Sequence, residues 1–369
     1  MNFVSQKATE ILGQNGFEAF VVGGFVRNMI MDMPPSDIDI CTNALPHETI
    51  EVFKNFRTVE TGLKHGTVTV MIDGIPAEIT TYRIDGEYIN HRKPEEVTFT
   101  PSLHEDLKRR DFTMNAIAYS FSSGFYDPFD GKSDIEKKII RCVGDAGRRF
   151  SEDALRILRA LRFSAVLGFE IENKTKEAIF SSYPLLSDIS KERITAEFLK
   201  LICGDYSHKV LKEYSEVFKF LSGYDTSAVA EEIGNSEKNG VIRLSYLENT
   251  DFLRLPLKTE NQIKFIKENL SSDLNDKKDI LLLLNKGGEE NTVLLFKRLK
   301  ICRDLLDEII SSGKAYKTDM LCISGNDVSA MGFSGKEIGN ILRTVLGKII
   351  EGQLENEKTQ VSDFIKKYF

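Results

Sequence analysis

The hydrophobic pattern of this 369-residue chain changes at Ser151. Before that residue, short runs that alternate with a period of two residues are mixed with helical segments, which predicts an α/β unit with a mixed sheet. After it, apolar residues recur at helical spacing, with almost no strand-like alternation. We therefore expect an α+β chain: a small α/β head up to about residue 145, followed by a long all-α portion.

The individual elements follow from periodicity and from turn residues. In the first part, strands are expected at 19–22, 36–40, 57–61, 67–72 and 77–82, and helices at 4–15, 25–31 and 46–54. Asp73-Gly74 is a strong hairpin signal between the last two strands. In the second part, helices are expected at 151–166, 172–180, 190–202, 207–213, 259–269, 276–284, 291–312, 335–350 and 360–368, with loops that include 286–290 and 323–333.

Composition limits the compartment and the partners. No apolar run approaches the roughly 18 residues of a membrane span, so no membrane association is expected. The five cysteines lack CxxC spacing, which argues against structural zinc or a disulfide framework and fits a reducing cytoplasm. A net charge of −7 would disfavour a nucleic-acid partner, but 13 of the 18 arginines lie before residue 200. The first half is therefore where an anionic ligand is expected.

Paired glycines and paired carboxylates form the first candidate site. Gly23 and Gly24 lie between a predicted strand and a predicted helix, where backbone N–H groups can approach an anion closely. Asp37 and Asp39 lie two residues apart on a predicted strand, so their side chains point the same way and suit divalent cations. This order favours nucleotidyl transfer. The alternative is a plain turn followed by a solvated strand face.

Glu78 and Arg110 allow two interpretations each. Glu78 lies on a strand that could pair with the Asp37–Asp39 strand, so it is either a third metal-facing carboxylate or an ordinary polar position. Arg110 lies in a segment whose apolar residues indicate partial burial, and a buried arginine needs a carboxylate or phosphate partner. That partner is either the substrate or Asp111.

Polar residues at every third position form a stripe on the helix predicted at 151–166, with Ser151 as its N-cap: Asp153, Arg156, Arg159 and Arg162. One interpretation is a surface helix with ion pairs between stripe residues. The other is base recognition, because a carboxylate accepts from an exocyclic amino group while a neighbouring arginine donates to ring acceptors. Cytosine and adenine offer that pattern, whereas uracil and guanine do not. The further arginines can hold phosphates.

An ordered set of motifs resembles the class II tRNA nucleotidyltransferases, especially the CCA-adding enzymes, and the bacterial poly(A) polymerases. The matching stretches are VGGFVR at 22–27, DID at 37–39, EITTYR at 78–83, DLKRRDFT at 106–113, EDALR at 152–156 and ERITAE at 192–197. The resemblance implies a polymerase-β-like head at 1–145, a helical neck at 146–204, a body at 205–290 and a tail at 291–369.

The same resemblance implies roles for individual residues. Asp37 and Asp39 match Mg²⁺ ligands, and Gly24 and Arg27 match triphosphate contacts. The residues that match contacts to the incoming nucleotide are Arg110, Asp153, Arg156, Arg159 and Arg162, of which Asp153 and Arg156 occupy the positions that serve as a protein template. Glu192, Arg193 and Glu197 match a motif that supports the neck. Asn28 and Asn90 depart from the pattern, since the family usually carries Asp at both positions.

The expected activity is addition of CCA to the 3′ end of tRNA from CTP and ATP, without a nucleic-acid template and with release of pyrophosphate. The segment 83–94 is absent from relatives that add only cytidines, so its presence disfavours that activity. The nearest alternative is an enzyme that adds only the final A to CC-ended tRNA. Further alternatives are a poly(A) polymerase, for which an extra basic tail is missing, a non-catalytic RNA-binding relative, and a small-molecule nucleotidyltransferase.

Overall fold

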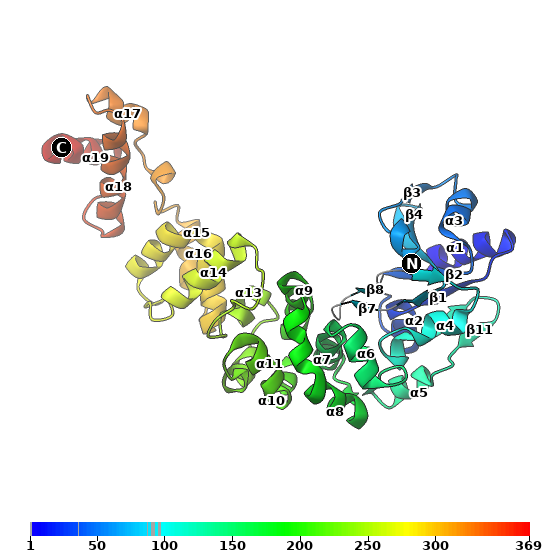
Figure 1. The fold of residues 1–369 in the computed structure, drawn as a ribbon. Helices are drawn as coiled ribbons and strands as arrows, with labels where there is room; N and C mark the ends of the chain where they lie inside the picture. The colour runs from blue at the N-terminus through cyan, green and yellow to red at the C-terminus, as the bar shows by residue number, and fades with distance from the viewer. Residues whose placement is uncertain (1, 36, 87, 90–92, 95–96) are drawn as a thin grey trace. The chain divides into compact units, whose positions relative to one another are not determined.

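The computed structural model describes every residue except 1, 36, 87, 90–92 and 95–96. The chain divides into two compact units. The first comprises 1–234 and 249–254, and the second comprises 235–248 and 255–369. In Figure 1 the described strands belong to the first unit, and the second consists of helices and loops. The finer division into head, neck, body and tail stays a prediction.

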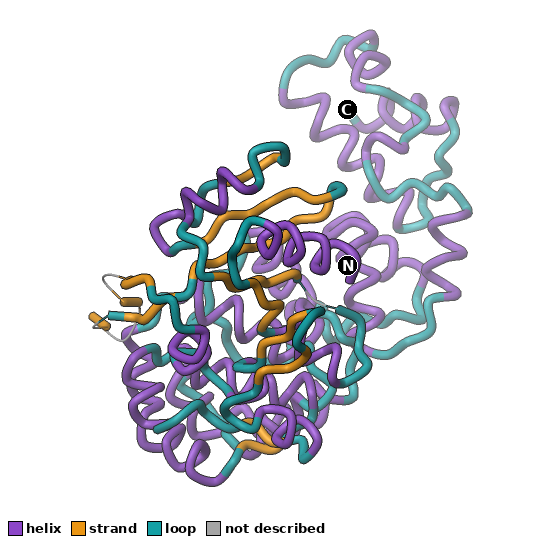
Figure 2. Tube along the Cα trace, turned by 90° about the vertical axis from the view of Figure 1, so that its right-hand side faces the viewer, coloured by secondary structure: helices purple, strands orange, loops and turns teal. Residues whose placement is uncertain are grey.

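A seven-stranded mixed sheet organises the first unit, and its strands are drawn in orange in Figure 2. Only the central pair β2–β5 is parallel, while the other neighbours in the sheet are antiparallel. The mixed sheet expected from the sequence is therefore confirmed. In spatial order the strands are β11 (Gly124–Tyr126), β10 (Ala118–Ser120), β1 (Ala19–Val22), β2 (Ile38–Thr42), β5 (Ile75–Thr81), β4 (Thr67–Ile72) and β3 (Arg57–Val59).

The β4–β5 hairpin shows how local sequence sets the register. Val68, Val70 and Ile72 of β4 are buried and alternate with partly exposed residues, as expected for a strand with one face on the core. Asp73 and Gly74 both have positive φ, 52° and 79°, which a type I′ turn requires. The hairpin predicted from this pair is confirmed, and it fixes β5 beside β2.

Helices and short strands complete the head. α1 buries Val4, Ala8 and Leu12. The helices are α1 (Asn2–Gln14), α2 (Gly24–Ile30), α3 (Pro46–Val52), α4 (Leu103–Lys108) and α5 (Gly131–Glu136), with 3₁₀ turns η1 (Leu63–His65) and η2 (Thr113–Asn115). The short strands pair as β6 (Arg83–Asp85) with β9 (Val97–Phe99), β7 (Tyr88–Ile89) with β8 (Lys93–Pro94), and β12 (Ile139–Ile140) with β13 (Glu170–Ile171).

The helix predicted at 151–166 is two helices, so that prediction is wrong at its start. α6 (Ala146–Glu152) ends at Asp153, whose extended backbone has φ −140° and ψ 101°. Ser151 is therefore not an N-cap but lies in the last turn of α6, where its hydroxyl donates to the carbonyl of Arg148. The helices that follow are α7 (Leu155–Leu167), α8 (Asn173–Ser182), η3 (Tyr183–Asp188), α9 (Lys191–Ile202), α10 (Ser207–Glu213), α11 (Ser215–Ser222), η4 (Thr226–Val229) and α12 (Ala230–Gly234).

The second unit packs its helices around two apolar clusters. One includes Phe265, Leu284 and Phe296, and the other includes Ile341 and Val361. The helices are α13 (Gly240–Leu244), α14 (Leu257–Glu268), α15 (Lys277–Leu299), α16 (Asp304–Ser311), η5 (Thr318–Met320), α17 (Gly325–Ala330), α18 (Lys336–Ile350) and α19 (Lys358–Tyr368).

Two boundaries predicted in this unit are wrong. The predicted helix 291–312 is interrupted, since α15 ends at Leu299 and Lys300 has φ 57° before α16 begins. The predicted loop 323–333 contains α17, which begins in a capping box between Ser324 and Asp327. Throughout the described residues, no helix is both long and apolar enough to span a membrane.

Candidate functional site

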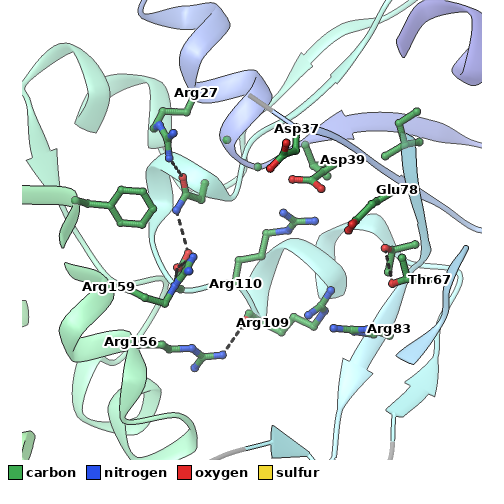
Figure 3. A pocket seen from close by; sticks show the side chains of 18 of the residues that line it. Arg27, Asp37, Asp39, Thr67, Glu78, Arg83, Arg109, Arg110, Arg156 and Arg159 are labelled. Atoms are coloured by element: carbon green, nitrogen blue, oxygen red, sulfur yellow. Dashed lines mark hydrogen bonds and ion pairs between the residues drawn. The ribbon is translucent and has the colours of Figure 1, made fainter. Parts of the chain in front are cut away.

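A pocket of about 590 Å³ lies in the first unit. It is within the size range of small-molecule sites. The β1–α2 turn, the start of β2, β5, the segment after α4, and α7 all contribute to its lining (Figure 3). Of the residues predicted from the sequence, it brings together Gly24, Arg27, Asp37, Asp39, Glu78, Arg110, Arg156, Arg159 and Arg162. Asp153 does not line it.

Three carboxylates lie on one side of the pocket (Figure 3). Asp39 and Glu78 are directly paired residues of the parallel strands β2 and β5, which confirms the predicted neighbouring strands. Asp37 is exposed and immediately precedes β2, which begins at Ile38; residue 36, where the sequence predicts the start of this strand, lies outside the described residues. Burial raises the pKa of Asp39 to about 6; the Arg110 cation opposes this shift, and the negative charges of Glu78 and Asp37 add to it.

These carboxylates fit a divalent cation only in part. In the described ranges, no group of three or more His, Cys, Asp or Glu side chains is placed to hold a metal ion. Asp37 and Asp39 nevertheless supply the oxygen atoms that Mg²⁺ prefers, and a cation would relieve the charge that accumulates around Asp39. The pair fits a cation whose remaining ligands come from substrate phosphates and water. Coordination by Glu78 stays a prediction.

Gly23 brings the backbone close to the carboxylates. Its φ of 69° and ψ of −136° lie outside the regions that residues with a side chain adopt readily. A Cβ atom built on Gly23 would lie 3.3 Å from Oδ2 of Asp39 and 3.5 Å from Nη1 of Arg110. A side chain at this position would therefore crowd the Asp39 carboxylate and come into ordinary contact with Arg110.

Arg110 is held by a carboxylate that the sequence did not point to. Asp106 is a fully buried residue of α4, and its two oxygens accept from Arg110 Nη2 at 3.2 Å and from Arg109 Nη2 at 2.8 Å. The predicted alternative of an ion pair between Arg110 and Asp111 is therefore wrong. Asp106 anchors one end of the Arg110 guanidinium, and the group lies beside Asp39 in the pocket (Figure 3).

Asp111 pairs instead with the stripe on α7. Its Oδ2 lies 2.7 Å from Nη2 of Arg159, and both side chains contribute to the pocket. Although burial alone would raise it, the Arg159 cation and its hydrogen bond lower the pKa of Asp111 to about 2. The pair is thus a partly buried, charge-assisted contact between the head and α7.

The stripe arginines find partners on other elements, so the interpretation as ion pairs within the stripe is wrong for the described residues. Glu197 of α9 lies 2.6 Å from Nε of Arg162 and 3.5 Å from Nη1 of Arg159. Arg156 Nη1 lies 2.7 Å from Glu152 Oε2 and also donates to the carbonyl of Arg149. The stripe is therefore fixed in place by α6 and α9.

Asp153 lies in the break between α6 and α7. Its Oδ1 accepts from the backbone N–H of Leu155 at 3.1 Å, and its Oδ2 accepts from Arg193 at 2.8 Å. Each oxygen thus has one donor and can accept a further hydrogen bond, so this carboxylate keeps acceptor capacity for a base while Arg193 holds it. Arg193 and Glu197, which the sequence assigned to support of the neck, contact Asp153 and Arg162.

Several pocket residues escaped the sequence analysis. Phe163 follows Arg162 and places its ring among three guanidinium groups, with Arg162 at 3.8 Å, Arg27 at 5.1 Å and Arg159 at 5.6 Å from the ring centroid. Its position beside the stripe was the only available signal. Thr80, Arg83 and Arg109 lie in matching motifs without an assigned role, and the remaining lining residues without a predicted role include Ile40, Thr67 and Asn115. Asn90 lies outside the described residues.

Comparisons with known proteins define the class. The family model described as the poly(A) polymerase head domain matches residues 19–141, and the one described as a probable RNA- and SrmB-binding site of polymerase A matches residues 168–217. The sheet, the carboxylate pocket and these matches define a nucleotidyltransferase with a polymerase-β-like head and a helical remainder. The expected fold class is thereby confirmed.

Full-length relatives identify the family. The CCA-adding enzyme of Enterococcus faecalis is 34% identical, over 96% of this chain and 93% of the relative. That of Bacillus cereus is 36% identical, over 97% and 96%. The solved Bacillus stearothermophilus CCA-adding enzyme in complex with CTP has a TM-score of 0.87 at 30% identity, covering 99% of this chain and 96% of that one. The chain belongs to the CCA-adding enzyme family, whose members generally depend on a divalent metal.

Proposed function

We propose that this protein adds C, C and A to the 3′ end of tRNA, using CTP and ATP and no nucleic-acid template. The observation that carries the proposal is the pocket itself, in which Asp37 and Asp39 lie opposite Arg27, with Arg110 beside Asp39. Such a site can hold a triphosphate between cationic side chains and metal-binding carboxylates. The relatives that match over nearly the full chain carry the name of this activity.

In the proposed reaction the 3′ hydroxyl of tRNA attacks the α-phosphate in line, and pyrophosphate leaves. Gly24 and Arg27 hold the triphosphate, with Arg110, Arg159 and Arg162 supplying further positive charge. Asp37 and Asp39 would hold Mg²⁺, which would activate the hydroxyl and neutralise phosphate charge. Glu78 completes the carboxylate side of the pocket by its pairing with Asp39.

Asp153 and Arg156 are the proposed template residues. Arg156 lines the pocket, while Asp153 lies three residues before it, in the break between α6 and α7. A carboxylate and a guanidinium can match the amino group and ring acceptors of cytosine and adenine. Because a carboxylate oxygen accepts more than one hydrogen bond, we propose that Asp153 accepts from the base amino group while Arg193 orients it, and that Arg156 exchanges Glu152 for the ring acceptors.

The remaining proposals concern the rest of the chain. We propose a head at 1–145 and a neck at 146–204, with tRNA held by a body at 205–290 and a tail at 291–369. These helical parts would recognise shape and phosphates, because an enzyme that serves every tRNA cannot rely on base sequence. We propose that the protein processes tRNA in the cytoplasm.

Asp39→Asn tests the proposed site. Incorporation of labelled CTP and ATP into tRNA without CCA is measured with Mg²⁺ and with EDTA. We expect Asp39→Asn to lower the rate by more than about a thousandfold, because a cation ligand is lost, and EDTA to abolish turnover by the unaltered protein. Binding of tRNA should change less than about twofold, since phosphate and shape contacts are retained.

Asp73→Asn serves as the control, because Asp73 is an exposed residue of the β4–β5 turn whose partner is Lys7. This variant should retain full activity. Turnover that survives in Asp39→Asn, or in EDTA, would rule out the assignment of Asp39 to a cation.

A further inference from the structure

Arg27 enters the pocket with only neutral side-chain partners. Its Nη1 donates to Oδ1 of Asn115 at 2.8 Å. Its Nε and Nη2 both donate to Oδ1 of Asn28, at 3.2 and 2.9 Å. In the part of the chain that the structure describes, no Asp or Glu forms an ion pair with Arg27.

The orientation of the Asn28 amide follows from its neighbours. A guanidinium can only donate, so the oxygen of the amide must face Arg27. The nitrogen of the same amide donates to the carbonyl of Pro34 at 2.9 Å, and a carbonyl can only accept. Asn28 therefore connects Arg27 to the loop before β2 through an oxygen that carries no formal charge.

The surroundings of Arg27 hold more cations than anions. Three guanidinium groups surround the ring of Phe163: those of Arg27, Arg159 and Arg162. Among the described residues, the carboxylates that form ion pairs with these three arginines are Asp111 and Glu197. Their partners are Arg159 and Arg162 of α7, and not Arg27. The excess positive charge therefore falls on Arg27.

Burial makes this excess charge costly in the absence of a ligand. Arg27 is 9% exposed. Burial and the nearby Arg162 cation lower the pKa of Arg27 to about 10, Asp111 opposes this shift, and Arg159 adds to it. Arg27 remains charged at neutral pH, and its geometry is fixed before an anion arrives. An anion that enters the pocket would relieve the repulsion among the three cations.

We propose that Asn28 is a positioning residue that orients the Arg27 guanidinium without neutralising it, so that its charge stays available to the phosphates of the nucleotide and of pyrophosphate. The proposal rests on the proposed function, in which Arg27 contacts the triphosphate. A carboxylate at residue 28 would pair with Arg27 through the same two nitrogens and would compete with phosphate for the cation. The neutral amide keeps the orientation and avoids that competition.

The decisive comparison is between Asn28→Asp and Asn28→Ala. Both exchanges lose the donor to the Pro34 carbonyl. Asn28→Asp keeps an acceptor for Arg27 but adds a negative charge, whereas Asn28→Ala removes the acceptor and leaves the charge of Arg27 unchanged. If residue 28 only supports the fold, Asn28→Ala must do more harm. If it keeps Arg27 unneutralised, Asn28→Asp must do more harm to anion binding.

Binding of inorganic pyrophosphate, measured by calorimetry in EDTA, provides the readout without catalysis or metal. We expect Asn28→Asp to bind pyrophosphate about tenfold more weakly than the unaltered protein, and Asn28→Ala about two- to threefold more weakly. Thermal unfolding of each variant shows that it is folded. Asp is the residue that the resembling family usually carries at this position, so we expect the exchange to fold.

Asn43→Asp is the matched control. Its side-chain oxygen accepts from the backbone N–H of Glu18 at 2.8 Å, so the exchange adds the same charge to the same unit at an oxygen that faces a backbone donor and not a guanidinium. Asn43→Asp should bind pyrophosphate as the unaltered protein does. A similar loss in this control would mean that net charge, and not the neighbour of Arg27, sets the affinity, and would overturn the proposal.

Two other results would also overturn it: equal affinity of Asn28→Asp and the unaltered protein for pyrophosphate, or weaker binding by Asn28→Ala than by Asn28→Asp.

Steady-state kinetics with CTP separate the roles further, because Asn28→Asp should raise KM more than it lowers kcat. Failure of the proposed function is distinguishable. An unaltered protein that binds pyrophosphate but adds nothing to tRNA would contradict the activity and leave the Asn28 comparison valid. One that binds no pyrophosphate would contradict the role of Asn28 itself.

Discussion

Asp39 and Glu78 are paired residues of the parallel strands β2 and β5, so two carboxylates face the same pocket from adjacent strands. With Asp37 beside them, they bring three negative charges close to one another on an edge that also contains Arg110. This arrangement costs stability when no cation is bound, and it is the part of the fold that most directly indicates metal-dependent phosphate chemistry.

Asp39→Asn should therefore stabilise the metal-free protein at neutral pH. Burial raises the pKa of Asp39 from 3.8 to about 6, so the folded state holds this proton more tightly than the unfolded state does. The resulting loss of stability begins as pH rises above 3.8 and is complete above about 6. We expect the variant to gain about 1 to 3 kcal/mol in the free energy of unfolding at pH 7.5, measured in urea with EDTA. The gain should vanish near pH 4, and a variant less stable than the parent at pH 7.5 would contradict this.

The Asp111–Arg159 pair should show the opposite pH dependence. Arg159 lowers the pKa of Asp111 from 3.8 to about 2 despite the burial that opposes it. The stability that the pair contributes is therefore fully present above pH 3.8 and is lost as pH falls toward 2. Asp111→Asn should lower the free energy of unfolding by about 3 kcal/mol at pH 7, because it leaves a partly buried arginine with a weaker partner. Asp73→Asn, which breaks the exposed Lys7 pair, should cost less than about 1 kcal/mol.

Arg193 should affect nucleotide choice through Asp153. If Arg193 orients this carboxylate, Arg193→Ala should reduce the preference for CTP over UTP in kcat/KM by about tenfold, with little change in tRNA binding. The double variant with Asp153→Ala should then discriminate no worse than Asp153→Ala alone. Lys191→Ala on the same helix, where Lys191 contacts the carbonyl of Asp251, is the control. If the effects of Arg193→Ala and Asp153→Ala on the CTP preference were strictly additive, Arg193 would not act on base selection through Asp153.

Gly23→Ala should impair both folding and catalysis. Its backbone conformation disfavours a side chain, so stability should fall by about 1 to 3 kcal/mol. The added Cβ would also crowd the Asp39 carboxylate, and kcat should fall at least about tenfold. Gly74→Ala is a matched control, since Gly74 has φ 79° but nothing within 4 Å of its Cβ position. That control should lose stability and keep its kcat, and equal kinetic effects in both variants would contradict the crowding.

The sequence predicted the strands well where burial and turns agree. β1 (Ala19–Val22) and β4 (Thr67–Ile72) have the bounds expected from their apolar runs, because a glycine or a β-turn ends each run. The break at Asp153 could not be predicted in the same way, since no glycine or proline marks it. It depends on contacts to Arg193 of α9, forty residues further along the chain.

The candidate site shows the same division. Nine residues predicted from the motifs line one pocket, because each motif indicates which side chains carry the charge that the chemistry needs. Partners were harder to predict, because a pairing depends on which elements meet in space. Asp106 lies in the DLKRRDFT motif, yet its ion pair with Arg110 depends on the turn that follows α4, which the motif does not specify. Similarly, the neutral partners of Arg27 come from residues 28 and 115, which are far apart in the sequence.

The most direct test of the proposed activity is extension of three tRNA substrates by the purified protein. One ends before CCA, one after the first C and one after CC, and each is supplied with CTP, ATP or both. We predict that CTP extends the first two, that ATP extends the CC-ended substrate, and that both nucleotides together complete CCA on all three. Addition of A to the CC-ended tRNA alone would contradict this and identify an A-adding enzyme, whereas a long run of A would identify a poly(A) polymerase.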